Sequence, residues 1–344
     1  MARQRIVSGE PSTDQRDEVV ALSLRPQSLD EYIGQDKLIE KLRIALTAAR
    51  QRGEPMEHVL LHGPPGLGKT TLAHVIANEM GTSLTVTAGP AVTKPADLVG
   101  TLTKLQAGDV LFIDEIHRLP VAVEEYVYSA MEDFKIDFVV DSGMHAKTIT
   151  LPLKPFTLIG ATTRAGLLSG PMRSRFGITH HLDFYEQVQM LAILERSAKL
   201  LDIEAIDTAA LEAMAVRSRG TPRVANRLLR RVRDYAQIRA NGAVDAPTVG
   251  DALELEGIDA LGLDDLDRAY LRTIGEVYRG GPVGLEAIAA TLNEDTGTLE
   301  DVVEPYLLQI GFLARTRRGR QLTQKAVDHL GLSLQLDQAN GLFE

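Results

Sequence analysis

The sequence predicts an α/β domain with a parallel sheet, followed by a small all-α domain and a C-terminal winged-helix domain. Short apolar runs alternate with helical patterns in the first half of the chain, which is typical of a parallel sheet covered by helices. Strand-like runs stop after Tyr185, and beyond Gly257 three helical patterns lead into a basic turn, the order of a winged helix. The expected boundaries are 1–20 for a loose arm, 21–184, 185–256 and 257–335 for the three domains, and 336–344 for a tail.

The first domain contains five strand-like runs. Apolar residues recur at helical spacing before the first of them, from Gly34 to Arg50, and after it, from Leu72 to Met80. Strands that alternate with helices in this way favour parallel pairing, because each crossover needs room for a helix. The runs are Val59–His62, Ser83–Thr87, Val110–Asp114, Phe156–Ala161 and His180–Phe184.

The segment 135–153 alternates between apolar and polar residues on both sides of Asp141-Ser142-Gly143. Such alternation around turn-forming residues predicts a hairpin. Its apolar residues, which include Ile149 and Leu151, either belong to the core or form a patch that a partner covers.

Helical patterns dominate the rest of the chain. Residues 186–256 contain only helical patterns, and three more follow at Leu266–Tyr278, Leu285–Leu292 and Leu299–Ile310. The basic turn Arg317-Arg318-Gly319-Arg320 then joins two short apolar segments, as in the wing of a winged helix.

The composition excludes several classes of protein. The chain has no cysteine, so disulfides and thiolate metal sites are ruled out. No apolar run reaches the roughly eighteen residues of a membrane span, and the N-terminus lacks a secretory signal, so we expect a cytoplasmic protein with no membrane contact. The net charge of −10 disfavours a surface that coats DNA, but arginines cluster at 217–239 and 315–320, which indicates selective anion sites.

A phosphate-binding loop stands between the first strand and the helix after it. Gly63–Thr70 fits the full eight-residue P-loop pattern in this context. Glycines let backbone N–H groups turn toward phosphates, and the helix N-terminus adds its positive end. Lys69 is expected to bind the β- and γ-phosphates and Thr70 to bind Mg²⁺, so ATP and Mg²⁺ are the expected ligands.

The apolar strand Val110–Asp114 leads into two adjacent carboxylates. Burial of unpaired charge is costly, so packing alone does not explain them. We expect Asp114 to hold Mg²⁺, partly through water, and Glu115 to act as the base for the water that attacks the γ-phosphate.

These motifs resemble those of the AAA+ superfamily of ring ATPases. The resemblance implies a sensor residue after the strand-like run 156–161, where Thr162 stands, and a second sensor at Arg223. It also implies an arginine finger, often supplied by a neighbouring subunit, at Arg175 or less readily at Arg173. Surface ion pairs would also explain the two arginines.

A narrower set of motifs resembles the RuvB family, the bacterial motors that drive branch migration of Holliday junctions, over about residues 20–330. Two of the motifs lie in the expected winged helix, so the likeness is not confined to the ATPase core. The motifs are Arg25–Gln35, Asp114–Leu119, Gly160–Gly166, Gly220–Arg233, Gly280–Leu285 and Glu304–Leu307.

The resemblance implies a P-loop AAA+ domain, a helical lid and a winged-helix head. It also implies a hexameric ring on the DNA arms, with RuvA at the junction and RuvC as the resolvase. DNA contacts fall on Arg315 and Arg320, with Arg317 and Arg318 nearby, and Ile149 and Leu151 fall on a hairpin that docks RuvA. Thr296 stands where some relatives carry a basic residue. The implied ATP contacts are Leu24, Arg25, Tyr32, Ile33, Gly66, Gly68, Lys69, Thr70, Thr71, Glu132, Asp133, Phe134, Arg175, Tyr185 and Arg223.

Other classes of protein fit less well. Asp114–His117 matches the DExH box of strand-separating helicases, but those carry two fused ATPase cores and this chain has room for one. A clamp-loader-like or other DNA-remodelling AAA+ ATPase is the main alternative, although a clamp loader ends in a helical collar and not in a basic wing. A DNA-binding regulator would have no use for Glu115.

Overall fold

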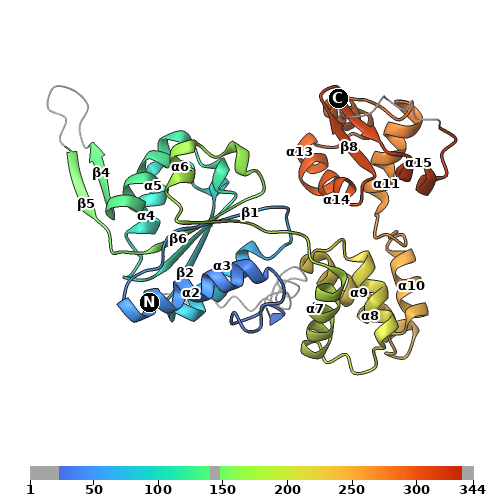
Figure 1. Cartoon of the computed structure of the whole chain (residues 1–344), viewed down its shortest axis with the longest axis horizontal. Helices are drawn as coiled ribbons and strands as arrows, with labels where there is room; N and C mark the ends of the chain where they lie inside the picture. The colour runs from blue at the N-terminus through green and yellow to red at the C-terminus, as the bar shows by residue number, and fades with distance from the viewer. Residues whose placement is uncertain (1–22, 140–147, 335–344) are drawn as a thin grey trace, which may run out of the picture.

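The computed structural model describes residues 23–139 and 148–334. The expected arm at 1–20, the turn at Asp141-Ser142-Gly143 and the tail at 336–344 lie outside these residues. Figure 1 shows the three parts of the chain in succession: the α/β part, a group of helices in yellow and orange, and a C-terminal part that contains a small hairpin.

A five-stranded parallel sheet forms the centre of the first domain, in the order β2-β3-β6-β1-β7. Each of the five expected runs contributes a strand. The last strand is earlier than predicted, because Ile178 donates its N–H to His58 and pairing with β1 ends at His181, while Leu182 turns into the core. The strands are β1 (Val59–His62), β2 (Leu84–Ala88), β3 (Val110–Asp114), β6 (Thr157–Thr162) and β7 (Ile178–His181).

Helices cover both faces of this sheet and bury two hydrophobic clusters. One cluster contains α2 and α3 and continues into the helices after Tyr185, so the first and second domains share a core. The other cluster contains α4 and α5 on the opposite face of the sheet. Alternate residues of β3 divide between the two clusters, with Phe112 in the first and Leu111 and Ile113 in the second. The helices are α2 (Asp36–Arg52), α3 (Lys69–Met80), α4 (Pro95–Leu102), α5 (Val121–Asp133) and α6 (Gly170–Ser174).

Residues 187–255 form four helices, as the patterns predict. They are α7 (Gln187–Leu200), α8 (Thr208–Arg217), α9 (Pro222–Arg239) and α10 (Ala246–Leu255). Asp207 and Asp245 accept the N–H groups of Ala210 and Thr248, and these caps fix the starts of α8 and α10.

The C-terminal domain is a winged helix with its own core. The wing is an antiparallel hairpin of β8 (Leu313–Thr316) and β9 (Gly319–Leu322), as expected. The third helical pattern is interrupted: α13 (Thr296–Thr298) and α14 (Glu304–Gln309) are separated by a wider π-helical turn, next to Pro305, which has no N–H to donate. The remaining helices are α11 (Asp265–Arg272), α12 (Leu285–Leu292) and α15 (Gln324–Leu330).

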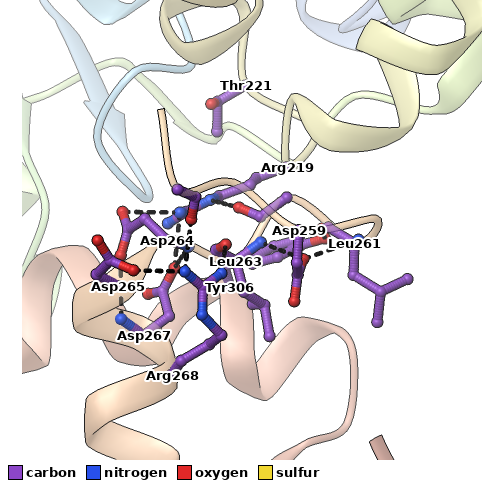
Figure 2. A network of polar contacts seen from close by, with 12 residues as sticks. Arg219, Thr221, Asp259, Leu261, Leu263, Asp264, Asp265, Asp267, Arg268 and Tyr306 are labelled. Atoms are coloured by element: carbon purple, nitrogen blue, oxygen red, sulfur yellow. Dashed lines mark hydrogen bonds and ion pairs between the residues drawn. The ribbon is translucent and has the colours of Figure 1, made fainter. Parts of the chain in front are cut away.

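A buried ion pair joins the second and third domains, as Figure 2 shows. Arg219, in the loop between α8 and α9, donates to Asp264 at 2.8 Å and lies 2.6 Å from Asp267, which is 1% exposed. Its guanidinium also lies over the ring of Tyr306, whose hydroxyl donates to the Leu261 carbonyl. Removal of one partner from such a buried pair is costly, so this contact ties the head to the lid.

No helix among the described residues is both long enough and apolar enough to cross a bilayer.

Candidate functional site

The P-loop connects β1 to α3 at the carboxyl edge of the sheet. Gly68 has a φ of 98°, a conformation that side-chain-bearing residues rarely adopt, and α3 begins with the next residue. A Cβ at Gly68 would lie 2.6 Å from the Tyr32 hydroxyl oxygen. The loop therefore needs glycine here for both its backbone and its close packing.

Lys69 lies inside this loop. Its side chain is nearly buried, and Nζ donates to the carbonyls of Gly63 and Pro64 at 2.8 and 2.9 Å. Burial lowers the pKa of Lys69, while the charges of Glu115 and Asp114 oppose that shift. The buried ammonium is suited to bind phosphate oxygens, and the nearby carboxylates are suited to hold Mg²⁺ beside them.

Two tyrosines from distant parts of the chain lie beneath the loop. The Tyr185 hydroxyl is 3.3 Å from the Leu67 carbonyl oxygen and 3.1 Å from the Tyr32 hydroxyl. Burial raises the pKa of Tyr185 to about 12. Tyr32 and Tyr185 therefore pack against the P-loop backbone. Ile33, the expected ATP contact next to Tyr32, is half-buried.

The remaining residues expected to bind ATP surround the same loop. Arg223 donates its backbone N–H to the Gly66 carbonyl at 3.3 Å, which brings the start of α9 to the P-loop. Thr70 and Thr71 lie in the first turn of α3. Leu24 is buried, and its carbonyl accepts from Arg196 of α7. Burial lowers the pKa of His74 in α3, and the positive charge of Arg25 lowers it further, so Arg25 lies near this helix.

The two carboxylates follow at the end of β3. Burial raises the pKa of Asp114, and Lys69 and Arg223 counteract the shift. Asp114 Oδ1 accepts the Glu115 N–H at 3.0 Å. Glu115 itself has a φ of 47°, so the chain turns sharply at the residue that is expected to act as the base. The residues present fit an ATP·Mg²⁺ site: an ammonium, a hydroxyl and two carboxylates at one edge of the sheet.

Glu115 is held by two residues, Thr163 and His117, for which the sequence motifs predicted no role in the site. Its Oε2 accepts from the Thr163 hydroxyl at 3.2 Å and the Thr163 N–H at 3.3 Å, and it lies 3.2 Å from His117 Nδ1. Thr162, expected as the sensor, is fully buried, and its hydroxyl contacts His117 at 2.8 Å. Successive side chains at the end of a strand point in opposite directions, so the sequence pattern itself indicates that only one of the two threonines can face Glu115.

Arg175 lies away from these groups within its own chain. Its polar partners are Glu132 Oε1 at 3.1 Å and the Pro171 carbonyl at 2.7 Å, and its guanidinium lies 4.6 Å from the centre of the Tyr128 ring. Arg173 donates to the Ala165 carbonyl. The polar partners of Arg175 thus belong to α5 and α6, whereas the charge of Arg173 also acts on His62 at the end of β1.

The three residues at 132–134, expected to contact ATP, have different partners in the structure. Glu132 pairs with Arg175, and Asp133 pairs with Lys135 at 3.0 Å. Phe134 is half-buried and packs edge-on against Phe156 with ring centroids 5.8 Å apart. Phe134 thus has a packing role in this chain.

The predicted hairpin is present as β4 (Lys135–Val139) and β5 (Thr148–Pro152). Ile149 is 47% exposed, whereas Leu151 is half-buried and lies opposite Ile136, which is fully buried. The structure therefore separates two residues that the pattern treats alike: Ile149 is available to a partner, and Leu151 belongs partly to the base of the hairpin.

The wing also differs from the simple expectation. Arg315 and Arg320 face each other across the hairpin and donate to the two oxygens of Glu304 at 2.7 and 2.8 Å. Glu304 has no exposed surface. Arg317 and Arg318 are exposed at the turn, and Arg315 also remains exposed despite its contact with Glu304. Thr296 begins α13, and Asp295 caps this helix.

Comparison with known proteins gives consistent matches along the chain. The family model described as "Holliday junction DNA helicase RuvB P-loop domain" matches residues 24–182. The models of the "RuvB AAA lid domain" and the "RuvB C-terminal winged helix domain" match residues 185–259 and 260–331.

Curated relatives and solved structures are similar over nearly the whole chain. The "Holliday junction branch migration complex subunit RuvB" of Desulfosudis oleivorans is 58% identical over 90% of each chain, and that of Lactococcus lactis is 55% identical over 95% of this chain and 97% of its own. The structure of the "RuvB Holliday junction branch migration motor" of Thermotoga maritima has a TM-score of 0.83 at 54% identity, and covers 91% of this chain and all of its own.

Proposed function

Since this chain belongs to the RuvB family, we propose that it is the ATP-driven DNA motor that moves Holliday junctions by branch migration. One observation carries the proposal: the match extends through the ATPase domain, the lid and the winged helix, so the ATP site and a DNA-binding head occur together. The clamp-loader-like alternative is not favoured, because the C-terminal domain is a winged helix and not a helical collar.

The residues of the P-loop edge divide the work of ATP hydrolysis. Lys69 and the backbone of the loop bind the phosphates, and Thr70 with Asp114 would hold Mg²⁺, which supplies positive charge against the phosphate oxygens when bound. Glu115 takes a proton from the attacking water. We assign the sensor contact to Thr163, because its hydroxyl and N–H fix the carboxylate of Glu115, with Thr162 and His117 behind it.

We propose that the chain acts as a ring, by family resemblance a hexamer, in which Arg175 serves the nucleotide of a neighbour. One observation supports this: the polar partners of Arg175 are Glu132 and the Pro171 carbonyl, and neither belongs to the P-loop of the same chain. An arginine finger is worth about 10³–10⁵ in rate, so ATP turnover would depend on assembly.

We propose three kinds of partner. The head would contact the phosphates of duplex DNA through Arg317 and Arg318, with Arg315 and Arg320 shared between DNA and Glu304. The hairpin β4–β5 would dock RuvA through Ile149, and RuvC would resolve the junction that the motor moves. A chromosomal substrate in a bacterium fits a cytoplasmic location.

A comparison of substrates tests the proposal. Branch migration of a four-way junction and ATP turnover would be measured with junction DNA and with linear duplex, with and without RuvA. We expect Glu115→Gln to bind ATP normally and to lose turnover by about 10²–10⁴-fold, the usual contribution of a general base. Glu40→Gln, exposed on α2, is the matched control. An unmodified chain that hydrolyses ATP but leaves junctions in place would refute the function.

A further inference from the structure

One arginine of the ATPase domain reaches the winged-helix head. Arg164 Nε donates to Asp301 at 2.8 Å, and its terminal nitrogen lies 3.0 Å from Glu300. The three side chains are each about one-third exposed. Arg164 directly follows Thr162 and Thr163, and the two acids lie in the π-helical turn between α13 and α14. The contact therefore joins the loop beside Glu115 to the head.

On its inner side, Arg164 is linked to the catalytic carboxylate by hydrogen bonds. Its backbone N–H donates to the Thr162 hydroxyl oxygen at 3.0 Å, and that hydroxyl contacts His117 Nδ1, which lies 3.2 Å from Glu115. Thr163, between Thr162 and Arg164, binds Glu115 directly. A shift of the Arg164 backbone would therefore alter both contacts that orient Glu115.

On its outer side, the same acids are near the wing. Glu300 lies 3.8 Å from Arg320 and 4.0 Å from Arg315, in addition to its contact with Arg164. A cavity of about 460 Å³ borders this group and is lined by residues of both domains, among them Arg164, Thr296, Glu300 and Arg320. The side chains can thus change partners without disturbing a packed core.

We propose that Arg164 is a positioning residue through which DNA bound at the wing controls Glu115, an inference that rests on the proposed motor function. DNA phosphates that bind Arg315 and Arg320 remove positive charge from the neighbourhood of Glu300. The carboxylate is then left to Arg164, and the pair between the domains becomes stronger. A tighter pair holds Thr162–Arg164 and, through them, Glu115 in one geometry.

The decisive variant is Glu300→Gln with Asp301→Asn, which removes the charges that hold Arg164 and touches no group in the ATP site. We expect the stimulation of ATP turnover by duplex DNA to fall about 5-fold or more, within the range of known couplings between sites. At saturating DNA the loss should lie in kcat, while KM for ATP and basal turnover stay within about 2-fold. DNA affinity should rise, because the variant removes negative charge beside Arg315 and Arg320. Glu276→Gln breaks the Arg272–Glu276 pair within the same head and is the matched control.

A charge exchange separates a specific pair from general damage to the head. Arg164→Asp should lose the stimulation, and Arg164→Asp with Asp301→Arg should recover it in part, because the exchanged charges can pair again. No recovery, in a protein whose two single variants bind DNA normally, would contradict the direct pair.

A measurement without turnover checks the same contact. The chain has no cysteine, so Lys104→Cys in the ATPase domain and Gln324→Cys in the head can carry a fluorophore pair. DNA should narrow the distribution of distances between the dyes in the otherwise unmodified chain but not in the Glu300→Gln, Asp301→Asn background. Equal narrowing in both would overturn the inference.

The two levels of the proposal fail in different ways. If DNA does not raise ATP turnover of the unmodified chain, the motor function falls and this inference with it. If DNA raises ATP turnover equally in the unmodified chain and in the Glu300→Gln, Asp301→Asn variant, only the proposed role of Arg164 is refuted.

Discussion

Glu304 should be the electrostatic anchor of the winged helix. Its carboxylate is fully buried and accepts from Tyr270 at 2.6 Å, Arg315 at 2.7 Å and Arg320 at 2.8 Å. Glu304→Gln keeps the shape but removes the charge, and it directs an amide toward a guanidinium. Loss of one partner from a buried pair costs about 3–5 kcal/mol. Because the two arginine side chains are 43% and 19% exposed, we reduce the expected loss to about 2–3 kcal/mol.

Hydrogen exchange of the head can measure this loss. The N–H of Leu322 donates to Gly280 and that of Phe312 to Leu307, so both report on opening of the domain. A loss of about 2–3 kcal/mol raises the opening constant by about 30- to 150-fold, since about 1.4 kcal/mol corresponds to a factor of ten. Exchange in α3 should not change. Local exchange is preferable to a melting curve, because the two-state approximation does not hold for multi-domain chains.

A matched variant and a clear negative result complete the test. Glu286→Gln alters an exposed carboxylate of the same domain and should leave exchange as it is. If Glu304→Gln speeds exchange in the wing less than about threefold, the three hydrogen bonds do not stabilise the head as we argue.

The other predictions concern the pH dependence of the head, the arginine finger and the hairpin. Burial raises the pKa of Glu304, but its contacts with Arg320, Tyr270 and Arg315 outweigh burial and lower the pKa. The head should therefore lose stability as pH falls below about 4.3, the pKa of an unfolded glutamate. In Glu304→Gln, hydrogen exchange should show a smaller loss of stability over the same pH range. A mixture of Arg175→Ala and Lys69→Ala subunits should regain part of the ATPase activity that each variant lacks alone, because some interfaces then pair an intact P-loop with an intact Arg175. No recovery would indicate that Arg175 acts within its own subunit. Ile149→Glu should weaken RuvA binding in a pull-down with basal turnover intact; unchanged binding would remove the hairpin from the interface.

The sequence alone determined those features whose chemistry is local. The P-loop from Gly63 to Thr70 and the strand that ends at Asp114 each combine a pattern with its immediate context, so backbone geometry over a few residues is enough to specify them. The alternation of strands and helices predicted the parallel sheet for the same reason, since side-chain periodicity is a property of each segment. The expected arm, hairpin turn and tail lie outside the described residues.

The tertiary structure alone decided which side chains meet. Arg164 and Asp301 are 137 positions apart, and nothing in either segment indicates the other. Periodicity made Ile149 and Leu151 equivalent, but Ile136 buries only the strand end that it faces. The sequence predicted that Arg315 and Arg320 are free to bind DNA, because it does not show that Glu304 is buried between them. Only the packing of the domain places this carboxylate out of water and in contact with both arginines. Ion pairs and burial depend on distances across the fold, and the order of residues along the chain does not contain those distances.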